Sequence, residues 1–90
     1  MELEQLRAFV AVAECGSFSQ GAKRLYTSHS SASRAVAALE EELGLRLLER
    51  DNRVLGLTAA GEVLLEEARQ ILAAAETAAR RVRAAGEKRE

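Results

Sequence analysis

Small hydroxyl side chains surround the only histidine of the chain, in the segment TSHSSASR from residue 27 to residue 34. Serine favours helix caps and turns, yet this segment runs directly into AVAALEEELGL, which has strong helical character. Short side chains at a helix start let the backbone approach DNA, and arginine can donate two hydrogen bonds to guanine or bind a phosphate. The segment therefore predicts contacts to DNA.

Positive charge is concentrated in the same part of the chain. The whole protein has 13 Lys and Arg against 14 Asp and Glu, a net charge of −1. Between Glu14 and Glu40, however, there is no acidic residue, while Lys23, Arg24 and Arg34 supply three positive charges. A local basic surface on a nearly neutral domain favours binding to nucleic-acid phosphates.

The sequence predicts neither a catalytic site nor a metal site. Serines within one helical turn of His29 cannot align as a nucleophile with its base, and no acidic residue lies near enough to orient that base. One histidine and the single cysteine, Cys15, cannot build a cysteine-rich metal site or an internal disulfide. We therefore expect no enzyme activity, no metal and no cofactor.

The length and composition fit one small globular unit. Hydrophobic residues make up 48% of the 90 residues and charged residues 30%, and no apolar run approaches the roughly 20 residues that cross a bilayer. The start, MELEQLRAFV, lacks the basic residues and cleavage site of a secretory signal. We expect a cytoplasmic protein, and a core this small would benefit from a partner subunit.

Apolar spacing and capping residues predict two helices before the serine cluster. Leu3, Leu6, Phe9, Val10 and Ala13 indicate a helix over residues 3–15, which Gly16 would end. A second helix over residues 18–25 would start at an N-cap, Ser17, with Gln20 at capping-box spacing, and would turn Phe18, Ala22 and Leu25 inward.

A third helix is predicted from an N-cap at Ser28 to about Leu43, before Gly44. Its inward face would consist of Ala32, Val36, Leu39 and Leu43. The opposite face begins with His29, Ser30, Ser33 and Arg34. Because only the three residues 26–28 separate this helix from the one before it, the pair has the layout of a helix-turn-helix.

Two short strands are predicted after the third helix. The turn-forming sequence ERDNR has apolar residues on both sides. They are Leu45 and Leu47 before it and Val54, Leu55 and Leu57 after it. Such a hairpin beside a helix-turn-helix is a wing, and it would lay Arg50 and Arg53 against the DNA backbone.

A long helix is predicted over residues 59–85, with Thr58 as its N-cap. At 1.5 Å per residue it would be roughly 40 Å long, too long to pack entirely on so small a domain. Apolar residues at alternating spacings of four and three predict a two-helix seam with a second subunit. The seam residues are Leu64, Ala68, Ile71, Ala75, Ala78, Val82 and Ala85, with Leu65 and Leu72 beside them. The alternative is a solvated alanine-rich tail, which we expect from Gly86 onward.

Several motifs together resemble the N-terminal DNA-binding domain of the LysR-type transcriptional regulators. They are GSFS at 16–19, SR at 33–34, LEEELG at 39–44, LLERDNR at 47–53 and LTAAGE at 57–62. The resemblance implies a mainly α fold, a winged helix-turn-helix over residues 1–58 and a linker helix over residues 59–90 that pairs two subunits antiparallel. It also implies binding of a partly palindromic promoter site, with the recognition helices in successive major grooves.

The DNA-contacting positions of that family are occupied here by Ser28, His29, Ser30, Ser33 and Arg34 on the third helix and by Arg50 and Arg53 on the wing. This chain departs from the usual residues at Gly21 (Ala), His29 (Gln), Ser30 (Pro), Ala32 (a branched apolar residue) and Leu48 (Phe). Histidine cannot copy the paired amide contact of glutamine to adenine, so the base preference at that position is open. The family's small-molecule effector would bind a C-terminal domain that these 90 residues do not include.

Two functions follow as hypotheses. The first is a dimeric, sequence-specific DNA-binding domain of a bacterial transcription regulator. The second is a dimerisation or protein-interaction module whose helical corner does not bind specific DNA, which the unusual His29 and Ser30 and the near-zero net charge favour.

Overall fold

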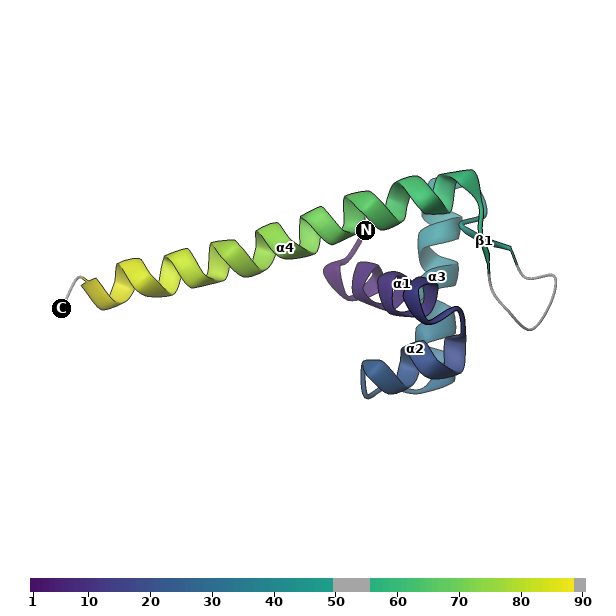
Figure 1. Ribbon diagram of the computed structural model, residues 1–90, viewed down its shortest axis with the longest axis horizontal. Helices are drawn as coiled ribbons and strands as arrows, with labels where there is room; N and C mark the ends of the chain where they lie inside the picture. Colours follow the sequence, from purple (N-terminus) through teal and green to yellow (C-terminus); the bar gives the residue numbers. More distant parts are fainter. Residues whose placement is uncertain (50–55, 89–90) are drawn as a thin grey trace.

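The computed structural model describes residues 1–49 and 56–88, and it is mainly helical (Figure 1). Its elements in chain order are α1 (Leu3–Cys15), α2 (Phe18–Arg24), α3 (His29–Leu43), β1 (Leu48–Glu49), β2 (Gly56–Leu57) and α4 (Ala59–Lys88). The first three helices and the strands form a globular part, and α4 begins on it and then extends away from it (Figure 1). The molecule is consequently elongated, with extents of 56 × 25 × 18 Å.

Capping residues define the helix ends close to where the sequence predicts them. Gly16 and Gly44 end α1 and α3 in the left-handed conformation, with φ of 67° and 73°. The Ser17, Ser28 and Thr58 hydroxyls accept hydrogen bonds from the backbone N–H groups of the third residue after each, at 3.0 to 3.1 Å. These N-caps are confirmed. The helix α2 ends one residue earlier than predicted, because Leu25 is its C-cap.

The core lies between α1, α3 and the first turns of α4. It is built from apolar side chains of all these elements, of α2 through Ala22, and of Leu47 and Leu48 at the start of β1. The fully buried large side chains are Leu6, Phe9, Val12, Val36, Leu39, Leu47 and Leu48. The inward face predicted for α3 is therefore confirmed for Val36 and Leu39, and also for Ala32.

The prediction that Leu43 faces the core is wrong. Its side chain is 41% exposed, and that of Leu45 is 47% exposed. The cause is the chain reversal at Gly44, after which Leu47 and Leu48 fill the core position that a longer apolar face of α3 would have occupied.

The predicted hairpin is present as two short antiparallel strands. Leu48 pairs with Leu57 and Glu49 with Gly56. The first strand starts later than predicted, after Leu45 and Leu47, and includes Glu49, which the sequence predicts to lie in the turn. The rest of the predicted turn, with Arg50 and Arg53, lies outside the described residues, as do Val54 and Leu55.

The start of α4 is fixed to the segment that precedes β1. The Thr58 N–H donates to the Leu47 carbonyl oxygen at 3.0 Å, and the Thr58 hydroxyl donates to the Arg46 carbonyl oxygen at 2.8 Å. A Cβ on Gly61 would lie 2.1 Å from the Leu47 carbonyl oxygen. Only glycine fits this approach, so Gly61 lets α4 begin directly against the hairpin.

The helix α4 runs further than predicted, through Gly86 to Lys88. An isolated glycine within a helix is tolerated at a modest cost, so Gly86 does not end it. The predicted seam divides into two parts. Leu64 and Ala68 are buried in the core of the chain's own globular part, whereas Ile71, Ala78, Val82 and Ala85 are exposed beyond it.

Candidate nucleic-acid interface

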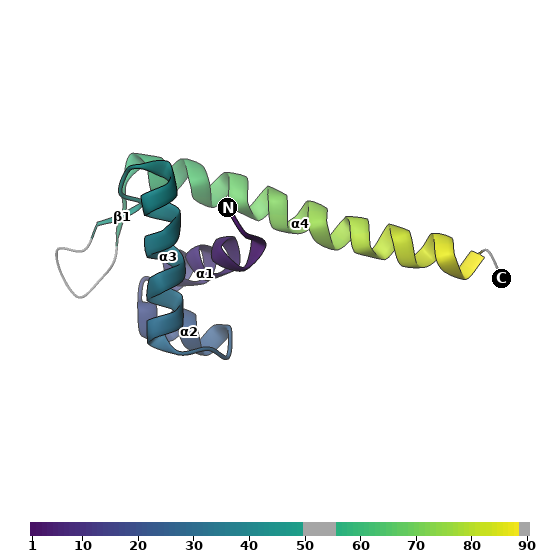
Figure 2. The same ribbon diagram turned by 180° about the vertical axis from the view of Figure 1, so that it is seen from behind.

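The helix α3 lies along the outside of the globular part, beside the hairpin strand β1 (Figure 2). Its Ala32 and Val36 side chains are buried, and the same helix exposes Ser30 and Arg34. Residues four apart on a helix lie on one face, so Ser30 and Arg34 project together away from the core. Ser33 is half-buried at the side of this face.

The first turn of α3 is held by its own cap and by α2. Ser28 accepts the Ser31 N–H and also donates its hydroxyl to the Ser31 hydroxyl, both at 3.0 Å. The exposed His29 ring lies 5.5 Å from the Phe18 ring, centroid to centroid, at a tilt of 46°. Ser31 is therefore engaged in capping, and the histidine is oriented by an aromatic neighbour.

Lys23 and Arg24 end α2, where their charges also suit the negative end of the helix dipole. Both side chains are exposed. Among the ion pairs of the described residues, Arg24 takes part in one with Glu14, while Lys23 and Arg34 take part in none. Lys23 and Arg34 can therefore bind a phosphate or a base without breaking an ion pair of the described residues.

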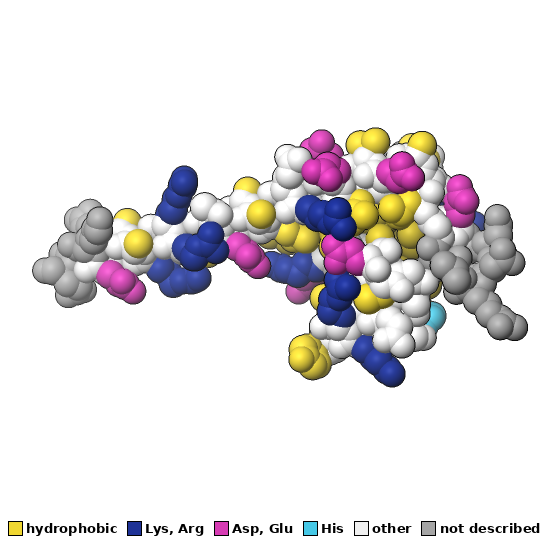
Figure 3. All heavy atoms as spheres, in the orientation of Figure 1, with side chains coloured by type: hydrophobic (Ala, Val, Ile, Leu, Met, Phe, Trp, Pro, Cys, Tyr) yellow, Lys and Arg dark blue, Asp and Glu magenta, His cyan; other side chains and the backbone are white. Residues whose placement is uncertain are grey.

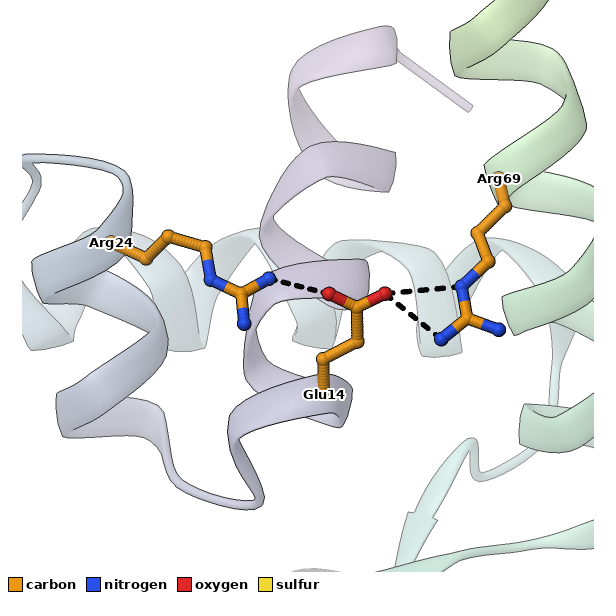
Figure 4. Close-up of polar contacts among 3 residues, drawn as sticks. All are labelled: Glu14, Arg24 and Arg69. Atoms are coloured by element: carbon orange, nitrogen blue, oxygen red, sulfur yellow. Dashed lines mark hydrogen bonds and ion pairs between the residues drawn. The ribbon is translucent and has the colours of Figure 1, made fainter.

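The carboxylate of Glu14 joins three helices (Figure 4). Its Oε1 accepts a hydrogen bond from Arg24 Nη1 at 2.5 Å, and its Oε2 accepts two from Arg69, at 3.0 Å from Nε and 2.9 Å from Nη2. The hydrogen bond from Arg24, followed by that from Arg69, holds the pKa of Glu14 below its usual value. The same contact raises the pKa of Arg24.

This cluster of Glu14, Arg24 and Arg69 was not predicted. Its members lie 10 and 55 residues apart in the chain, so no local spacing signals it. Because Arg69 belongs to α4 and Arg24 to α2, the cluster ties the direction of α4 to the helix-turn-helix.

A second unpredicted carboxylate positions the hairpin. Glu40 Oε2 accepts the backbone N–H groups of Leu47 at 2.9 Å and Leu48 at 3.3 Å, and Glu40 Oε1 lies 3.8 Å from Arg46 Nη1. Backbone N–H groups bound by a carboxylate form strong hydrogen bonds. Glu40 therefore fixes the start of β1 relative to α3, and so the placement of the hairpin beside that helix.

The turn before α3 carries an unusual residue. Tyr26 has a φ of 56°, a left-handed conformation that is uncommon for a large side chain, and its side chain is 98% exposed. Its N–H still donates to the Lys23 carbonyl oxygen at 3.1 Å. An aromatic side chain therefore projects into solvent two residues before the cap of α3.

The described part of the chain has neither a metal-binding cluster nor a membrane-spanning helix. No group of three His, Cys, Asp or Glu side chains that could hold a metal ion occurs within residues 1–49 and 56–88. No helix in these ranges is both long and apolar enough to cross a membrane.

Comparison with known proteins places this arrangement among bacterial regulators. Residues 3–62 match the family model described as bacterial regulatory helix-turn-helix protein, lysR family. The transcriptional regulator TfdT of Cupriavidus pinatubonensis is 47% identical over 85 residues, which are 94% of this chain and 37% of TfdT. The transcriptional activator HcaR of Escherichia coli is 48% identical over 83 residues, 92% of this chain and 28% of HcaR.

Solved structures give the same result. A complex of the CbnR DNA-binding domain with DNA matches with a TM-score of 0.90 and 49% identity, over 96% of this chain and 99% of that one. The BenM DNA-binding domain in complex with catB site 1 DNA matches with a TM-score of 0.89 and 37% identity, over 92% of each chain. The chain spans less than two fifths of the length of TfdT and of HcaR.

Proposed function

Because the chain belongs to the lysR family of bacterial regulatory helix-turn-helix proteins and forms a LysR-type DNA-binding domain, we propose that it reads a partly palindromic promoter site as a homodimer. Residues 1–58 act as the winged helix-turn-helix, and residues 59–90 act as the helix that pairs two copies. The relatives named above are transcriptional regulators, and we infer that this chain likewise has no catalytic role.

The observation that carries the proposal is the outward face of the first two turns of α3. This face has hydroxyls and one unpaired arginine, has no acidic residue, and lies directly opposite buried core side chains. In the major groove, Arg34 would donate two hydrogen bonds to a guanine. Around it, Ser30 and Ser33 would contact base edges, and Ser28 and His29 would contact bases or phosphates near the helix start.

Backbone contacts would come from the flanks of this helix. Lys23 at the end of α2 would bind a phosphate, and Arg24 would do so while sharing its charge with Glu14. On the wing, Arg50 and Arg53 would bind the DNA backbone. A small-molecule effector would act through a domain that lies outside these residues.

Selection of bound sites from random double-stranded DNA tests the proposal. We expect enrichment of two inverted half-sites with centres about 10 bp apart, the spacing of one helical turn of DNA. Failure to enrich any sequence, together with binding that does not weaken as salt rises, would favour the alternative of a protein-interaction module.

The variant Arg34→Ala then tests the role of α3. On a duplex with the selected site it should lose about 1–3 kcal/mol of binding free energy, and on a random duplex much less, by fluorescence anisotropy. Arg83→Ala removes an exposed arginine of α4 instead and should leave both affinities nearly unchanged. Equal losses on both duplexes for Arg34→Ala would mean that this residue binds phosphate only.

A further inference from the structure

His29 is the only long side chain at the start of α3. Every other residue from position 27 to position 33 is serine, threonine or alanine, and the His29 side chain is exposed. The next long side chain on the outward face is that of Arg34, five residues further along the helix. When this end of α3 enters a groove of DNA, the imidazole therefore reaches further from the helix axis than its neighbours do.

The imidazole is already oriented in the free chain. Its ring lies 5.5 Å from the ring of Phe18, centroid to centroid, and is tilted by 46°. This separation falls within the range of favourable aromatic pairs. Phe18 is itself half-buried against the core at the start of α2, so it is a fixed support. A side chain that is held in its binding conformation loses less conformational entropy when it binds.

The surface beside His29 is basic rather than acidic. The end of the globular part that α2 and the first turn of α3 form shows Lys or Arg side chains and the histidine, and no Asp or Glu (Figure 3). His29 takes part in no ion pair with the residues that the structure describes. Its ring can therefore donate a hydrogen bond to DNA without first leaving a carboxylate.

The hydrogen-bonding groups of an imidazole favour one base. The ring offers an N–H donor in both protonation states, whereas it offers an acceptor only when it is neutral. In the major groove, guanine presents two neighbouring acceptors, N7 and O6, while adenine presents the acceptor N7 beside the donor N6. A donor from His29 is therefore favoured at guanine and meets a second donor at adenine. A glutamine carries both a donor and an acceptor and matches adenine instead.

We infer that His29 selects a guanine in each half-site through a hydrogen bond to N7 or O6, and that Phe18 positions its ring for this contact. The inference rests on the proposed function, because it requires α3 to enter the major groove. Along the helix axis His29 lies roughly 7.5 Å from Arg34, about two base-pair steps, so the two residues read different base pairs.

Duplexes that carry each of the four bases at each position of the selected site test the choice of base. Fluorescence anisotropy should show one position in each half-site where guanine is preferred because of His29. His29→Ala should reduce this preference about fivefold to tenfold, and His29→Gln should move it to adenine. The preference at the position that Arg34 reads should stay unchanged in both variants.

Substitutions of Phe18 test its positioning role. Phe18→Leu keeps a large apolar side chain but removes the ring, and it should lower the guanine preference about threefold. Phe18→Tyr keeps the ring and should preserve the preference. In a chain that already carries His29→Ala, Phe18→Leu should not change the base preference, because the side chain that Phe18 positions is absent. Circular dichroism checks that each variant keeps its helix content.

The outcomes separate the inference from the proposed function. A guanine preference that persists in His29→Ala, a preference for another base that disappears in it, or an equal loss of affinity for every duplex would overturn the choice of guanine by His29. An effect of Phe18→Leu that is equally large without His29 would contradict the positioning role. Failure to select any site contradicts the proposed function itself, whereas a selected site that tolerates every His29 variant contradicts only the inference.

Discussion

The helix α3 and the distal half of α4 carry the same kind of apolar pattern but differ in what covers it. Both repeat apolar residues at spacings of four and three. On α3 the side chains of Val36 and Leu39 are fully buried, because α1 packs over them within the chain. On distal α4 the pattern continues through Ile71 and Val82, yet these side chains are exposed.

The two helices differ in what stabilises them: α3 is held by packing within the chain, whereas distal α4 has no such packing. The globular part completes its core within one chain, with Leu64 and Ala68 from the start of α4 among the buried residues, so a single chain can hold α3 in place. Helices that lack tertiary packing are marginal in water, so distal α4 depends on a second copy for its order. In the proposed function, DNA reading and subunit pairing therefore belong to two regions with different sources of stability.

The largest expected effect on stability comes from truncating Leu39, a buried side chain of α3 in the core that α1 and α3 share. Leu39→Ala leaves a cavity in the core and should lower the free energy of unfolding by about 2–5 kcal/mol, a large share of what so small a domain has. Urea unfolding followed by circular dichroism measures it. A loss below about 1 kcal/mol would show that the core is not closed around this residue.

The matched change on distal α4 should behave differently. Val82→Ala should leave the unfolding of the helix-turn-helix within about 0.5 kcal/mol of the unchanged protein in dilute solution, because its side chain is exposed there. It should weaken dimerisation instead. A comparable destabilisation of the dilute protein by both variants would remove the distinction between the two regions.

The smallest expected effect lies at the boundary of the two regions, in the cluster of Glu14, Arg24 and Arg69. The pKa of Glu14 is lowered in the folded protein, so its contribution to stability is complete above the usual value of 4.5 and is lost as pH falls below it. Glu14→Gln should therefore lower Tm by a few °C near pH 7 and reduce the fall in stability between about pH 6 and about pH 3.

Thermal unfolding across that pH range checks this prediction. Glu41→Gln, which removes an exposed carboxylate outside the described ion pairs, is its control and should leave the pH dependence nearly as it is. Identical curves for Glu14→Gln and the unchanged protein would mean that the cluster adds nothing to the anchoring of α4.

Features set by neighbouring residues could be predicted from the sequence. The caps at Ser17, Ser28 and Thr58 and the helix ends at Gly16 and Gly44 depend on hydrogen bonds and backbone angles within a few residues. The hairpin and the inward face of α3 follow from local spacing in the same way. The identity of each DNA-contacting residue stays a prediction.

Features set by long-range packing could not be predicted. Leu43 continues the apolar spacing of α3, but Leu47 and Leu48 cover the core beyond Gly44. Leu64 and Ala68 obey the spacing of a two-helix seam and of a domain core equally well, and only the fold assigns them to the core. The carboxylates of Glu14 and Glu40 bind groups that the chain brings near only once it is folded.

Hydrogen exchange of the free protein at several concentrations tests the separation of the two regions most directly. We expect the backbone amides around Val36 and Leu39 to be equally protected at every concentration, because the single chain buries them. The amides of residues 75–85 should be protected only where the protein is dimeric. Strong protection of residues 75–85 in the dilute monomer, or protection of both helices that rises together with concentration, would contradict the account.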